Sequence, residues 1–112
     1  MTKATSDLLK KAGVPNHLKG YEYLGEAIEM VVKDRKLIYS ITTVIYRSIA
    51  KKFEITSSRV ERGIRYAIEY CFNNLSPDLI EELFGNTLSY NKGKPVNAQF
   101  IATLSDLITQ EN

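Results

Sequence analysis

The fold is decided by residues 45–68, IYRSIAKKFEITSSRVERGIRYAI. Apolar residues repeat at helical spacing on both sides of a break at residues 54–56, which predicts two helices joined by a turn of three or four residues. Such a pair forms a helix-turn-helix, which we expect to span about residues 41–73. Ala50 is small where the two helices must cross, and Glu54 stands where many such turns have glycine.

The second of these helices has two chemically different faces. At about 100° per residue, one face is apolar and consists of Val60, Ile64, Ala67 and Cys71. The opposite face presents Arg59, Arg62 and Arg65. Arginine can bond guanine O6 and N7 together, and the carboxylate of Glu61 can accept from cytosine N4. Glu61 also precedes Arg65 by four residues, the spacing of a favourable helical ion pair. The pattern predicts base contacts in the major groove, with an ordinary solvated helix face as the alternative.

Basic charge is concentrated around this helix. The whole chain has a net charge of only +2, which indicates little by itself. Residues 35–66, however, hold eight Lys and Arg against two Glu, whereas residues 67–91 hold four acidic residues and no basic one. A basic segment beside DNA releases counterions and an acidic segment is repelled. We therefore expect the two segments to face different partners.

The remaining sequence predicts four further helices and no strand. They cover about residues 6–12, 18–33, 77–84 and 97 to the C-terminal end. The expected N-caps are short polar residues, namely Ser6, Ser40, Ser57 or Ser58, Ser76 and Asn97. In the helix from residue 40 to 53 we expect the inward side chains to be Ile41, Val44, Ile45, Ile49 and Phe53. With 44% apolar residues among 112, the chain is expected to be a single all-α, six-helix domain with one core.

Several function classes lack the residues they require. His17 is the only histidine, which leaves no Ser-His-Asp triad and no histidine-rich metal site. The glycines are isolated, so no phosphate-binding loop is formed. We expect no catalytic residue, no cofactor and no metal. No apolar run approaches the roughly 18 residues of a membrane span, the N-terminus lacks a signal-peptide core, and the single Cys71 fits a reducing compartment. We expect a cytoplasmic, nucleoid-associated protein with Cys71 in its core.

At this point five runs of sequence become recognisable: GVPNHLKGYEYLGEAI, SITTVIYRSIAKKF, SSRVERGIRYAIE, LFGNTLS and KGKPVNAQFIA. They resemble the C-terminal effector domain of the stage-zero sporulation response regulator and cover most of residues 13–104. The resemblance implies a six-helix fold that binds TGTCGAA-type boxes as tandem, head-to-tail dimers, activating some promoters and repressing others. The family's full-length regulator also has an N-terminal receiver domain phosphorylated by a phosphorelay. We expect that domain to be absent, because 112 all-helical residues cannot form it.

The resemblance also assigns roles to individual residues. It implies base contacts by Glu61, Arg62 and Arg65. The expected contacts to the DNA backbone are Ser58, Arg59, Lys92 and Lys94. Two departures stand out: Gly63 replaces a usual Ala, which should cost up to about 1 kcal/mol of helix stability, and Tyr66 replaces a usual His.

Residues 71–83, CFNNLSPDLIEEL, differ from the family pattern. In the family this region contacts the housekeeping sigma factor of RNA polymerase. The acidic side chains of Asp78, Glu81 and Glu82 suit a basic partner surface, although a solvated helix face explains them equally well. The alternative function is a helical interaction module that contacts sigma factor without base-specific DNA reading. Steep salt dependence of DNA binding would separate the two, and RNA is disfavoured because its A-form groove excludes a helix.

Overall fold

The computed structural model describes residues 1–85 and 96–111. Its six α-helices are α1 (Lys3–Lys11), α2 (Lys19–Lys33), α3 (Tyr46–Phe53), α4 (Ser57–Asn74), α5 (Pro77–Phe84) and α6 (Asn97–Glu111). A 3-10 helix, η1 (Arg35–Ser40), and a π-helical turn, η2 (Ile41–Ile45), connect α2 to α3. No strand occurs in the described ranges. The predicted all-α, six-helix fold is confirmed.

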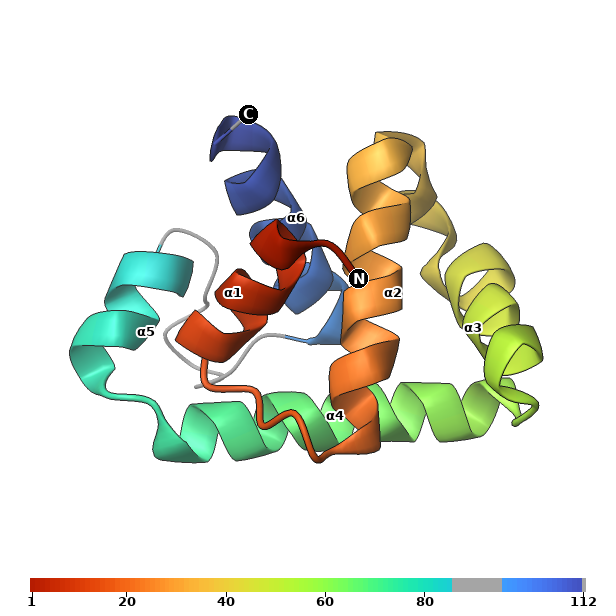
Figure 1. The fold of residues 1–112 in the computed structure, drawn as a ribbon, viewed down its shortest axis with the longest axis horizontal. Helices are drawn as coiled ribbons and strands as arrows, with labels where there is room; N and C mark the ends of the chain where they lie inside the picture. The colour runs from red at the N-terminus through yellow and green to blue at the C-terminus, as the bar shows by residue number, and fades with distance from the viewer. Residues whose placement is uncertain (86–95, 112) are drawn as a thin grey trace.

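Helix α2 is the centre of the packing (Figure 1). It contacts α1, α3, α4 and α6, and α4 lies across its first turns. All six helices contribute large, fully buried side chains, among them Leu9, Leu24, Ile28, Ile49, Ile64, Ile68, Phe84, Phe100 and Leu104. Helix α3 adjoins the start of α4, and α5 follows its far end (Figure 1). None of the described helices is long and apolar enough to cross a membrane.

The ends of α1 and α5 follow ordinary capping chemistry. Ser76 caps α5 as predicted, accepting from the Leu79 N–H at 3.2 Å. Gly13 adopts φ +82° directly after α1, a conformation that glycine reaches without a steric penalty. The predicted cap of α1 is wrong: Thr2, not Ser6, accepts from the Thr5 N–H at 3.2 Å, so the helix begins three residues earlier than predicted.

The segment before α3 also differs from the prediction. A continuous helix from Ser40 is wrong, because the chain forms η1 and η2 first and Ser40 makes no cap hydrogen bond. Residues 41–45 are all β-branched, and such side chains disfavour the α-helix by crowding the preceding turn. The Tyr46 N–H bonds back to the Ile41 carbonyl, five residues away. The extra residue in this turn buries Ile45 and leaves Val44 38% exposed, so the inward assignment of Val44 is wrong.

Candidate nucleic-acid interface

Three residues form the turn between α3 and α4. Glu54 adopts a left-handed conformation (φ 56°, ψ 46°) and is the only non-glycine residue with positive φ in the described chain. The N–H of Ile55 donates to the Ala50 carbonyl at 3.0 Å, which closes the end of α3. A left-handed residue other than glycine costs roughly 1–2 kcal/mol. The tertiary packing on both sides of the turn holds Glu54 in this conformation.

Thr56 is the N-cap of α4. Its hydroxyl accepts from the Arg59 N–H at 3.1 Å, so the predicted caps Ser57 and Ser58 are wrong. Both serines instead lie in the first turn of the helix, where Ser58 is exposed. An exposed hydroxyl there can contact a phosphate oxygen, so the backbone contact expected of Ser58 stays a prediction.

Helix α4 separates its apolar and basic faces as predicted. Four residues of the apolar face have no exposed surface: Val60, Ile64, Ala67 and Cys71. Arg59, Arg62 and Arg65 are all exposed. Burial of one face fixes the helix against the core and directs three guanidinium groups toward solvent from its first three turns. Outward guanidinium groups on a helix can bond guanine O6 and N7 when the helix lies in a major groove.

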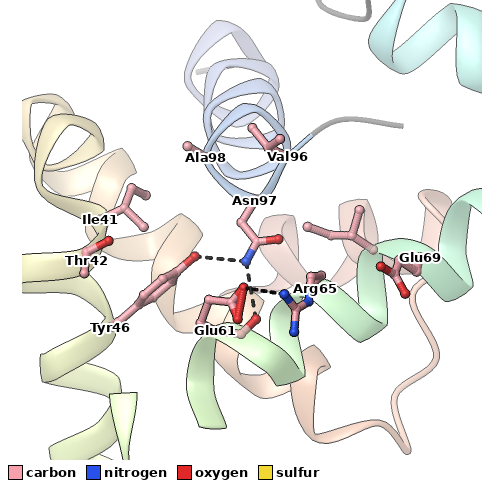
Figure 2. Close-up of a pocket in the computed structure, with 10 residues that line it drawn as sticks. Ile41, Thr42, Tyr46, Glu61, Arg65, Glu69, Val96, Asn97 and Ala98 are labelled. Carbon is pink, nitrogen blue, oxygen red and sulfur yellow. Dashed lines mark hydrogen bonds and ion pairs between the residues drawn. The ribbon is translucent and has the colours of Figure 1, made fainter. Parts of the chain in front are cut away.

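The predicted ion pair between Glu61 and Arg65 is present. Arg65 Nη1 lies 3.3 Å from Glu61 Oε1, and the two side chains are 54% and 35% exposed (Figure 2). A pair this exposed adds little stability. Its effect is on direction, because the half-buried carboxylate holds one end of a long side chain that would otherwise sample many rotamers.

Asn97, at the start of α6, bridges α3 and α4 (Figure 2). Its side-chain amide donates to the Tyr46 hydroxyl at 3.0 Å and to the Glu61 main-chain carbonyl at 3.3 Å. Asn97 was expected to cap α6, and this is wrong. The cap position is Val96, whose carbonyl accepts from the Phe100 N–H at 3.0 Å. The amide of Asn97 thereby ties the first turn of α6 to the backbone of a predicted base-contacting residue.

Tyr46 is suited to accept this bond. Burial raises the pKa of its hydroxyl above the ordinary value, and the nearby Glu61 carboxylate raises it further, against an opposing effect of the Asn97 hydrogen bond. The hydroxyl is therefore neutral at physiological pH. Its oxygen accepts from Asn97, and its proton remains available to a second acceptor.

Two adjoining grooves run beside α4 at this bridge. Their volumes are about 590 and 540 Å³, and both have Thr42, Tyr46, Glu61 and Arg65 in their walls. The larger groove, drawn in Figure 2, continues toward α6 and is mainly apolar. The smaller one continues toward Arg62 and the start of α4.

Two further lysines, Lys51 and Lys52, lie in the last turn of α3. The amine of Lys52 pairs with the Glu26 carboxylate of α2, which also raises its pKa, whereas Lys51 forms no ion pair among the described residues. The predicted phosphate contacts Lys92 and Lys94 lie outside the described residues.

The acidic residues lie away from this surface. Three acidic side chains of α5 are exposed, namely those of Asp78, Glu81 and Glu82. Helix α5 follows the end of α4 that lies away from α3 (Figure 1). Glu82 pairs with Lys11 at 3.3 Å, which leaves Asp78 and Glu81 without a described ion pair. The 18 residues of α4 correspond to roughly 27 Å. Two oppositely charged surfaces at the two ends of one helix fit two different partners.

Cys71 is a core residue, as predicted. It is fully buried, and its thiol donates to the Ala12 carbonyl. Burial raises the pKa of the thiol to about 12. The protonated thiol is a poor nucleophile. In the described part of the chain, no three His, Cys, Asp or Glu side chains come close enough to hold a metal ion.

Two residues of this surface are not identified by sequence reasoning. Tyr46 and Asn97 are 51 positions apart, and no local pattern predicts that they meet. The sequence offers one weak indication of this contact, because both residues lie inside the runs that carry the family resemblance.

Comparison with known protein families identifies the family of this chain. Residues 5–108 match the family described as "Sporulation initiation factor Spo0A C terminal". The match covers α2 to α5 completely, and all of α1 and α6 except the first residues of α1 and the last residues of α6. The chain therefore belongs to the family of C-terminal, DNA-binding domains of the sporulation initiation factor Spo0A.

Proposed function

We propose that this domain binds tandem TGTCGAA-type boxes as a head-to-tail dimer and thereby controls promoters at the start of sporulation. In this proposal α3 and α4 act as the helix-turn-helix and α4 enters the major groove. One observation carries the proposal: three arginines and a glutamate project from the first half of a helix whose other face is fully buried.

Each residue has a distinct role in this proposal. Arg62 and Arg65 donate to guanine, and Glu61 accepts from cytosine while orienting Arg65. Ser58 and Arg59 contact the backbone, together with Lys92 and Lys94. Half or more of the hydrogen bonds in such complexes go to phosphate and sugar. The backbone contacts therefore fix the position of the domain on the duplex, and the base contacts of Glu61, Arg62 and Arg65 set the sequence specificity.

We further propose that the exposed acidic residues of α5 contact the sigma factor of RNA polymerase. Asp78 and Glu81 have no described ion pair, and α5 lies at the end of α4 away from the DNA-contacting residues. Reversing both charges should abolish activation without changing affinity for DNA. Activation that survives the reversal would show that the acidic face is only solvated.

The test of DNA reading is an anisotropy titration on a duplex with two boxes and on a scrambled duplex. Arg62→Lys is the sharpest variant, because it keeps the charge but loses the planar fork that bonds guanine twice. We expect preference for the boxes to fall by about 1–3 kcal/mol, with the salt dependence almost unchanged. Equal binding of the native domain to both duplexes would leave the interaction-module alternative.

A further inference from the structure

A second basic surface lies on the other side of α4, where the first turn of α2 meets it. A hollow of about 350 Å³ is lined there by the basic side chains of Lys19, Arg59 and Arg62, with Tyr66 beside them. No carboxylate belongs to the described residues that line it. This surface is called the Lys19 hollow below.

Gly20 makes this close approach of α2 and α4 possible. A Cβ atom on Gly20 would lie 2.2 Å from the carbonyl oxygen of Gly63, far closer than any real contact. Only glycine at position 20 therefore lets α2 approach the backbone of α4. The neighbouring residue, Lys19, is consequently held beside the exposed arginines of α4 although it is 40 positions before Arg59 in the chain.

The three cations of the hollow have no ion-pair partner among the described residues. Lys19, Arg59 and Arg62 form no ion pair within the described ranges. Other basic residues do, and these are Lys3, Lys11, Arg35, Lys52 and Arg65. Converging cations that are not neutralised by the protein repel one another, and a bound anion removes that repulsion.

The position of the hollow suggests which anion it receives. An α-helix is roughly 10–12 Å wide and fills a major groove of about 12 Å. When α4 occupies the groove, the two phosphate backbones therefore pass along its flanks. Lys19 lies on one flank, on a different helix, where it reaches the backbone and not the base edges.

We propose that the Lys19 hollow binds a phosphate of the DNA backbone through direct contacts of Lys19 and Arg59, with the Tyr66 hydroxyl as a further donor, whereas Arg62 at its edge keeps its proposed contact to guanine. The proposal rests on the proposed function, since it requires α4 in the major groove. It adds a backbone contact from outside the helix-turn-helix, on the flank of α4 opposite the two grooves beside Glu61.

The test compares Lys19→Gln with Lys33→Gln. Lys33 is an exposed lysine at the other end of α2, roughly 20 Å away, so both variants change the net charge equally. Binding constants are measured on the boxed and scrambled duplexes from about 50 to 300 mM salt. Lys19→Arg is the restoring variant because it keeps the charge at the same place.

Loss of one phosphate contact should lower the slope of log K against log salt by about 0.9. For each bound protomer, we expect Lys19→Gln to lose this amount and to bind both duplexes about threefold more weakly near 150 mM salt. Lys33→Gln should keep the native slope, and Lys19→Arg should restore it.

Three results would overturn the inference: an unchanged slope in Lys19→Gln, an equal loss in Lys33→Gln, or weaker binding confined to the boxed duplex. These outcomes are separate from failure of the proposed function. That failure appears in the native domain itself, as equal affinity for the two duplexes.

Discussion

Substituting Gly20 by alanine tests the contact that joins α2 to the DNA-contacting helix. The added Cβ would lie 2.2 Å from the Gly63 carbonyl oxygen and 2.8 Å from the Ala67 Cβ, where real atoms stay beyond 3.0 Å. The two helices must therefore separate by about 0.8 Å along this line. The obstacle is partly backbone, so no rotamer change relieves it.

The magnitude follows from two opposing effects. Overpacking of a well-packed interface costs about 1–3 kcal/mol, whereas replacing glycine in a helix gains at most about 1 kcal/mol and less in a first turn. We expect Gly20→Ala to lower the free energy of unfolding by about 2 kcal/mol, which is about 10 °C in Tm for a domain of this size. Urea unfolding measures the free energy and thermal unfolding measures Tm, both followed by circular dichroism.

Gly63→Ala is the matched control on the other side of the contact. Its Cβ would lie 2.9 Å from the Tyr23 ring, which can tilt, and at an ordinary contact distance of 3.9 Å from the Gly20 Cα. The gain in helix propensity offsets that adjustment, so we expect a change within about 1 kcal/mol. A Gly20→Ala protein as stable as the native one, or one no less stable than Gly63→Ala, would refute the close approach of the two helices.

Three further changes have defined outcomes. Asn97→Ala removes the bridge to Tyr46 and to the Glu61 carbonyl, so urea unfolding should show a loss of about 1–2 kcal/mol; no loss would mean that water replaces the amide. Glu54→Gly relieves the left-handed backbone and should raise the midpoint of urea unfolding by the equivalent of about 1 kcal/mol, and a lower midpoint would contradict this. Cys71 should resist a thiol reagent at pH 8 until urea is added. Because its pKa is about 12 in the folded state against an ordinary 9.0, the unfolded thiol ionises first and stability should fall as pH rises above 9; rapid labelling of the folded protein would contradict the burial.

The amphipathic pattern of α4 correctly predicts which of its residues are buried and which are exposed. Val60 and Ile64 are four positions apart and buried, whereas Arg59 and Arg62 are three positions apart and exposed, as their spacing predicts. This prediction depends only on the geometry of a single helix, so it requires no knowledge of the rest of the fold. Neither the partners of these residues nor their roles on DNA follow from periodicity.

Helix starts are harder to predict because neighbouring residues compete for one role. Thr56, Ser57 and Ser58 are all good N-caps, and only the geometry of the turn at Glu54 selects Thr56. The start of α3 is equally hard to predict. Five consecutive β-branched residues disfavour the α-helix before it, but packing decides which turn forms in its place.

Contacts between distant segments are absent from the local pattern altogether. By helix propensity alone, Gly63 is a weak position in α4. In the structure it lies against Gly20, where a carbonyl replaces a side chain as the contact surface. The same limit applies to Asn97, whose partners lie 51 and 36 residues earlier in the chain.

The central claim is that α4 reads base edges, and the Arg62→Lys titration tests it most directly. Binding to the boxed and the scrambled duplex is measured at several salt concentrations for the native domain and the variant. We expect the native domain to prefer the boxes, and Arg62→Lys to lose about 1–3 kcal/mol of that preference while its salt slope stays the same. An unchanged preference in Arg62→Lys would contradict base reading by Arg62, and no preference in the native domain would contradict the DNA-reading role of α4 as a whole.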